Sequence, residues 1–275
     1  MKLSLRLLTC VIALMGCVGL RAQESALPVP LQEVQLEDDV QARLSAALDI
    51  PIARNLSLEW SEQVRMHNNV SDVDKILSSV GVSYKVLPWL KLGASYSFVN
   101  VRDAEMNTLT GAEEVEWKTR HMVDADVTGS YKIGRLKLSL RERVRFKFRG
   151  DSINEYEHVN PGITLRSRLK AAYDIRQSRW EPYAFVELST TLNALNAVPN
   201  FKNYSVAYKQ YMNRLRFAVG TECKLNNHHR LDIYYQYQMN QGYDARYKAN
   251  KGELKSWTHE KQNCHVIGLD YKFKL

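Results

Sequence analysis

Apolar and polar side chains alternate with a period of two through most of the chain after residue 38. In the first such segment Val40, Leu44 and Leu48 fall on one row, and Arg43 and Asp49 fall on the other. This alternation is typical of a β-strand with one apolar face and one polar face. The pattern therefore predicts an all-β protein.

The alternating segments are about ten residues long, which is the length that a tilted strand needs to cross a bilayer. Eleven are expected, at 40–50, 56–66, 76–86, 90–98, 123–133, 136–148, 163–175, 183–192, 215–225, 231–239 and 267–275. The facing of 183–192 is ambiguous, and we favour Ala184, Val186, Leu188 and Leu192 on the apolar row. Residues 27–37 supply a weaker segment that brings the count to twelve, within a range of 10–14. Alternatively, the N-terminal segment threads through the lumen, or one of the eleven assigned strands is wrong.

The connections between these segments alternate in length. Short turns are expected near 51–55, 87–89, 134–135, 176–181 and 226–229, and long loops near 67–74, 100–119, 150–160, 193–208 and 241–262. Short turns at one end and long loops at the other are typical of outer-membrane barrels. The polar rows carry many charges, which suit a polar lumen but not the core of a soluble barrel. The sequence thus predicts an antiparallel transmembrane β-barrel with apolar rows facing lipid, short periplasmic turns and long extracellular loops.

The N-terminus has the features of a secretory signal peptide. Lys2 and Arg6 precede the apolar run 7–20, and cleavage is expected after Ala22. A lipoprotein-type cleavage before Cys17 is the alternative. Removing residues 1–22 takes away three basic and no acidic residues, which lowers the formal charge from +8 to +5. The expected organisation is a signal peptide at 1–22, an N-terminal segment at 23–38 and an outer-membrane barrel at 39–275.

Two cysteines remain after such cleavage. Cys223 lies on the lipid-facing row of its segment and Cys264 on the lumen-facing row of its own. Side chains on opposite faces of a sheet cannot bridge, so two free thiols are expected.

Several stretches together resemble the uncharacterised outer-membrane β-barrel family DUF2490. They are 80–98 (VGVSYKVLPWLKLGASYSF), 135–149 (RLKLSLRERVRFKFR), 165–188, 213–238 and 265–275 (HVIGLDYKFKL). The resemblance implies a secreted outer-membrane barrel and carries no activity to transfer. Its expected partners are outer-membrane lipid and lipopolysaccharide, periplasmic chaperones and the barrel-insertion machinery. The insertion signal would be Ile267, Leu269, Tyr271, Phe273 and Leu275, with Leu275 standing where such chains usually end in Phe.

A basic wall is the most distinctive feature of the expected lumen. Its residues are Arg141, Arg143, Arg145, Lys147, Arg166, Arg168, Lys170, Arg214 and Arg216. One interpretation is a structural salt-bridge network with inward-facing carboxylates: Asp49, Glu59, Asp124, Asp126, Glu187, Glu222 and Asp232. The other is a positive lumen that favours anions, as rings of Arg and Lys do in anion pores.

Three functions are therefore considered: a small anion-favouring pore, a non-conducting structural or surface-interaction barrel, and an outer-membrane hydrolase acting on lipid or peptide. The sequence shows no hydrolase motif, and no catalytic residue, metal site, cofactor or nucleic-acid partner is expected. Glu62 and Glu142 interrupt apolar rows. They are expected either to be turned inward by a bulge or to mark a face that touches another protein.

Overall fold

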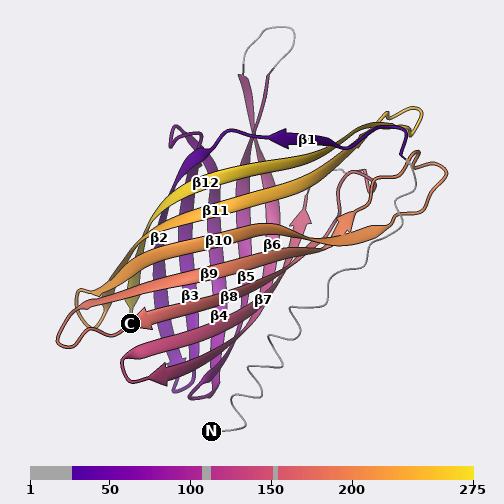
Figure 1. The fold of residues 1–275 in the computed structure, drawn as a ribbon. Helices are drawn as coiled ribbons and strands as arrows, with labels where there is room; N and C mark the ends of the chain where they lie inside the picture. The colour runs from indigo at the N-terminus through magenta and orange to yellow at the C-terminus, as the bar shows by residue number, and fades with distance from the viewer. Residues whose placement is uncertain (1–26, 107–112, 151–153) are drawn as a thin grey trace.

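The computed structural model describes residues 27–106, 113–150 and 154–275, and these residues form a β-barrel (Figure 1). The strands are β1 (Gln32–Gln35), β2 (Asp39–Ala53), β3 (Leu56–His67), β4 (Asp72–Leu87), β5 (Leu90–Met106), β6 (Glu113–Ile133), β7 (Leu136–Arg149), β8 (Gly162–Tyr173), β9 (Trp180–Leu195), β10 (Tyr208–Lys224), β11 (His229–Tyr247) and β12 (Leu254–Lys274). Within the described ranges, no helix is long and apolar enough to cross a membrane. The predicted signal peptide and the lipoprotein alternative at Cys17 lie outside the described residues.

The barrel wall is closed by eleven strands, β2 to β12. Sequence neighbours pair in antiparallel fashion, and β12 then pairs with β2 in parallel, with Leu44 opposite Leu269. Parallel closure follows from the odd number, because eleven strands joined by hairpins leave the first and the last pointing the same way. The short β1 also pairs in parallel with β12, with Gln32 opposite Thr258, so that it continues the line of β2. The predicted total of twelve strands is confirmed. The additional strand is β1, which lies along the wall and does not widen it.

The predicted facing of the strands is confirmed. Large apolar side chains such as Leu44, Val219 and Ile267 are exposed on the outer surface. The ambiguous segment in β9 faces as favoured, because Tyr183 and Glu187 are buried while Ala184 between them is exposed. Pleating alone enforces this result, since successive side chains point to opposite faces of a sheet.

The connections do not sort by length as fully as expected, because the β3–β4 connection (68–71) is shorter than the β8–β9 connection (174–179) at the other end. Part of the expected long loops is strand. β5 and β6 stay paired as far as Met106 opposite Glu113, and β11 and β12 as far as Tyr247 opposite Leu254. These residues were expected in the loops 100–119 and 241–262. Polar residues beyond the lipid-facing belt carry no alternating signal, yet their backbones still find ladder partners.

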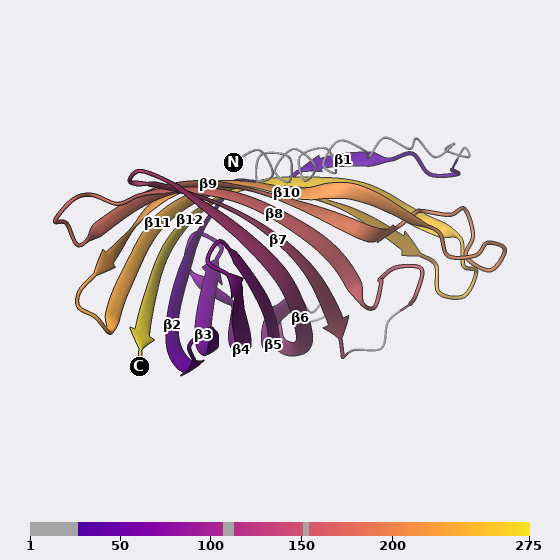
Figure 2. The ribbon, with the colours of Figure 1, turned by 90° about the horizontal axis from the view of Figure 1, so that it is seen from below.

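The two halves of the wall cross at a steep angle. β8–β12 slope across the front of Figure 1, while β2–β5 stand upright behind them, and Figure 2 shows the resulting arched profile. Inward side chains fill part of the space between the halves, including a small apolar cluster of Leu77, Val99, Val101 and Met122. Cys223 and Cys264 are buried and free, which confirms the expectation of two unpaired thiols.

Candidate functional site: a lumen of two chambers

The lumen contains two cavities in series. The inner chamber, near the short turns, has a volume of about 380 Å³ and is lined by residues such as Glu59, Asp270 and Lys272. The outer chamber, towards the long loops, has a volume of about 980 Å³ and is lined by residues such as Lys147 and Arg214. The two linings share four residues, which mark the level at which the chambers meet: Arg65, Leu77, Met122 and Arg145.

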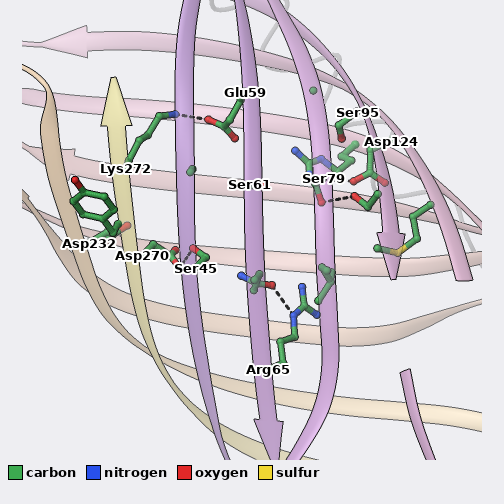
Figure 3. A pocket seen from close by; sticks show the side chains of 18 of the residues that line it. Ser45, Glu59, Ser61, Arg65, Ser79, Ser95, Asp124, Asp232, Asp270 and Lys272 are labelled. Atoms are coloured by element: carbon green, nitrogen blue, oxygen red, sulfur yellow. Dashed lines mark hydrogen bonds and ion pairs between the residues drawn. The ribbon is translucent and has the colours of Figure 1, made fainter. Parts of the chain in front are cut away.

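The inner chamber is polar and electrically balanced. Five carboxylates line it (Glu59, Asp124, Glu222, Asp232 and Asp270), together with five cations (Arg65, Arg143, Arg145, Arg230 and Lys272). Figure 3 shows Lys272 reaching Glu59, and Ser45 beside Asp270, to which its hydroxyl donates at 2.5 Å. Three carboxylates of this chamber pair with its cations: Glu59 with Lys272, Asp124 with Arg143 and Arg145, and Glu222 with Arg230.

Glu187 on β9 contacts three arginines of the basic wall, Arg141, Arg168 and Arg216. Its carboxylate accepts from Nε of Arg168 at 2.7 Å and from Nη1 of Arg216 at 2.6 Å, and Nη2 of Arg141 lies 3.6 Å away. Glu187 is only 1% exposed. The three partners lie on β7, β8 and β10, so the group fastens four consecutive strands from the inside.

A second group centres on Asp124 of β6. Arg145 donates to both of its oxygens, from Nε at 2.7 Å and from Nη2 at 2.6 Å. Arg143 bridges Asp124 at 3.2 Å and Asp126 at 2.8 Å. Such two-pronged arginine–carboxylate contacts are strong and directional. These two groups confirm the salt-bridge interpretation for five of the nine wall residues: Arg141, Arg143, Arg145, Arg168 and Arg216.

The other four wall residues behave differently. The ammonium group of Lys170 lies 3.6 Å above the centre of the Tyr183 ring. In the described part of the chain, Lys147, Arg166 and Arg214 have no carboxylate within 4.0 Å. Nε of Arg166 is buried without a hydrogen-bond partner in the same ranges. These three cations line the outer chamber.

Arg43 and Arg65 also line this chamber, although neither belongs to the basic wall expected from the sequence. Arg43 donates to the Gln238 amide oxygen at 3.2 Å, and Arg65 donates to the Gln63 amide oxygen at 2.7 Å. These partners are neutral, so both charges stay uncompensated. Each is the only arginine or lysine on the lumen row of its strand, so no run of basic residues marks it in the sequence. The position of each arginine on the inward-facing row of its strand was the signal in the sequence that could have identified it.

The outer chamber is consequently positive. Eight cations line it against four carboxylates, Glu37, Asp38, Asp39 and Asp74. Asp74 is paired with Lys75 at 2.8 Å, and the other three belong to the segment that leads from β1 into β2. In the described ranges, none of these carboxylates lies within 4.0 Å of Arg43, Arg65, Lys147, Arg166 or Arg214.

Four residues of the expected insertion signal lie on the outward-facing row at the end of β12, and Leu275 directly follows the strand. Ile267, Leu269 and Tyr271 are exposed on the outer surface. The ring of Phe273 packs 4.9 Å from that of His229, and the backbone N–H of Leu275 donates to Asp49 at 3.0 Å. The last strand is thus paired on both sides, by β11 and by β2.

The two glutamates that interrupt apolar rows do face outward. Pairing is continuous where Glu62 lies opposite Ser78 and Glu142 opposite Ser167, so the bulge interpretation is wrong. Each carboxylate instead accepts a hydrogen bond from that serine hydroxyl, at 2.6 Å in both cases. A neighbouring hydroxyl on the same face offers the carboxylate a partner without any backbone distortion.

Comparison with known proteins identifies a family but no activity. The family described as "Protein of unknown function (DUF2490)" matches residues 41–248, more than half of the chain. No curated protein matches the chain. Among solved structures, the β-domain of the Bordetella autotransporter BrkA is similar at 11% identity and a TM-score of 0.41, over 80% of this chain and 84% of that one. OmpT, an outer-membrane protein of Vibrio cholerae, is similar at 14% identity and a TM-score of 0.34, over 75% of this chain and 56% of that one.

Proposed function

Since the chain belongs to the DUF2490 family of outer-membrane-type β-barrels, whose function is unknown, we propose that it is a narrow, anion-favouring pore of the outer membrane. One observation carries the proposal. Five cations that line the outer chamber have no carboxylate within 4.0 Å in the described ranges: Arg43, Arg65, Lys147, Arg166 and Arg214.

Unpaired charges in a confined lumen are costly unless mobile anions or water compensate them. A barrel that served only as a scaffold would gain stability by pairing them, as the Glu187 and Asp124 groups pair theirs. Positive side chains around a constricted path attract anions and repel cations. The uneven placement of charge therefore favours a pore over the structural alternative.

Ion conductance in planar bilayers tests the proposal. The protein, refolded and checked by its gel shift on heating, is measured under a gradient of KCl. We expect discrete current steps and a reversal potential displaced from zero towards the equilibrium potential of chloride. Charge reversal in Lys147→Glu/Arg214→Glu is expected to move the reversal potential towards potassium selectivity.

Arg176→Glu is the matched control, because Arg176 is exposed in the short turn between β8 and β9. It introduces a charge reversal of the same kind outside the outer chamber, so selectivity should stay close to that of the wild type. A folded barrel that carries no current would refute the pore. So would a current whose selectivity changes equally in the control and in the double variant.

The proposal includes the location and assembly of the barrel. Export by the N-terminal signal peptide, escort by periplasmic chaperones and insertion through the C-terminal strand would deliver it to a membrane of lipid and lipopolysaccharide. The apolar outer surface and the fully paired β12 support this route. We propose no catalytic step for the lumen.

A further inference from the structure

The uncompensated cations of the outer chamber are not spread evenly but gather around Arg214. Four of them lie close enough to Arg214 for their charges to interact with it: Arg43, Arg65, Lys147 and Arg166. They project from five separate strands, β2, β3, β7, β8 and β10. The paired strands of the wall hold these mutually repelling charges in place, and Glu187 lies within electrostatic reach of Arg166 and Arg214. An anion bound among the five cations would relieve the remaining repulsion.

The existing hydrogen bonds leave most of the donors of this group available. Arg214 uses Nε on the amide oxygen of Asn240, and Arg65 uses Nε on Gln63. In both residues the two terminal guanidinium nitrogens have no hydrogen bond within the described part of the chain. A neutral amide that holds Nε fixes the plane of the guanidinium group while leaving its charge intact. This arrangement presents an oriented donor pair to the lumen.

The size of the chamber indicates the kind of anion. Its volume of about 980 Å³ is at the upper end of the range for small-molecule sites, and chloride would occupy little of it. Guanidinium groups match the paired oxygens of phosphate and carboxylate, which accept two parallel hydrogen bonds, whereas a monatomic ion offers a single acceptor atom. Five converging charges also require more than one negative group for neutralisation.

We infer that the outer chamber is a binding site for a small, multivalent oxyanion solute, centred on Arg214 and completed by Arg43, Arg65, Lys147 and Arg166. Phosphate esters and polycarboxylates share this chemistry. The inference rests on the same chamber as the proposed pore, but it requires only that the ligand enter and bind. The solute arrives through water, because all five side chains lie on lumen rows and the outer face of these strands is apolar.

Isothermal titration calorimetry of the folded protein in a neutral detergent at low salt provides the test. The probes are inorganic pyrophosphate, citrate and, as a monovalent comparison, acetate. We expect saturable binding of pyrophosphate or of citrate and none of acetate over the same range of concentration. Which of the two multivalent probes binds tells a phosphate-type ligand from a carboxylate-type one.

Arg214→Gln should weaken binding roughly ten-fold or more, because it removes charge-assisted hydrogen bonds at the centre of the cluster. Arg176→Gln, in the exposed short turn, is the matched control and should leave the affinity unchanged. Should Arg214→Gln fail to fold, Lys147→Gln serves in its place, since this ammonium group makes no hydrogen bond within the described ranges. It is likewise expected to weaken binding.

The inference is overturned if neither multivalent probe binds the folded wild-type protein. It is equally overturned if the lumen variants bind as tightly as Arg176→Gln. Calorimetry detects binding whether or not the barrel conducts ions, so the binding site and the pore can be refuted independently of each other. Binding by a barrel that does not conduct would refute the pore alone, and chloride current without oxyanion binding would refute the binding site alone.

Discussion

Oε1 of Glu187 lies 2.6 Å from Nη1 of Arg216, and both side chains are withdrawn from solvent, at 1% and 5% exposure. The residues lie directly opposite each other on β9 and β10. The other carboxylate oxygen serves Arg168 and Arg141. A single negative charge thus faces three positive ones, and this level of the lumen retains a positive balance even where it is paired.

Glu187→Gln is expected to destabilise the barrel by about 3–5 kcal/mol, because it leaves three guanidinium groups without their carboxylate in a confined site. Urea unfolding of the protein folded into lipid vesicles measures the change. Glu253→Gln is the matched control. Glu253 is half-exposed in the β11–β12 connection, where a hydrogen bond from Lys248 lowers its carboxyl pKa. The substitution there should change stability little, because water screens this pair. Equal effects of the two substitutions would contradict a structural role for the Glu187 group.

Gly268→Ala is expected to destabilise the barrel by about 1–3 kcal/mol through overpacking. Gly268 lies opposite Tyr234 on the lumen face, and an added Cβ would fall within the Tyr234 ring. Gly129→Ala is the control, because a Cβ there would meet no atom within 4 Å. The same urea titration compares them. If Gly268→Ala leaves the free energy of unfolding unchanged, the Tyr234 ring does not pack against this glycine.

Parallel closure of the barrel predicts a specific cross-link. Leu44→Cys/Leu269→Cys, in a background with Cys223 and Cys264 replaced by serine, should form a disulfide on mild oxidation because these residues are direct partners. Leu44→Cys/Ile233→Cys should not, since Ile233 is the partner of Leu269 on the next strand, roughly 9–10 Å from Leu44. The shift of the oxidised band on a non-reducing gel reports the result. Cross-linking of the second pair but not the first would refute the closure.

Glu142→Leu is expected to raise the stability of the barrel in lipid by about 1 kcal/mol, since it removes a carboxylate from the lipid-facing belt. Oε2 accepts from Ser167, whereas Oε1 has no partner among the described residues. Glu62→Leu should gain less, because Glu62 also accepts from Nε1 of Trp60 at 3.0 Å. Urea unfolding gives the stability and analytical ultracentrifugation the oligomeric size. Lower stability together with a smaller assembly would instead identify Glu142 as part of a contact with another protein.

The sequence alone determined which side chains face lipid and which face the lumen. The rows through Leu44, Val219 and Ile267, and the inward positions of Arg141 and Glu187, follow from a period of two that each strand expresses by itself. The alternation of short and long connections, and the total of twelve strands, are likewise readable along the chain. These are local properties, and pleating transmits them to the fold unchanged.

Only the tertiary structure decided which charges are compensated. Arg168 and Arg166 lie two residues apart on one row, yet only Arg168 reaches Glu187 within ion-pair distance. The reason is the register of β8 against β9, which places Arg168 directly opposite Glu187. Contacts between distant segments determine the register of the strands, the parallel closure against β12 and the crossing of the two halves of the wall. The same contacts bring Arg43 and Arg65 to Arg214. Their positions follow from how the strands pair around the lumen, which no single strand encodes.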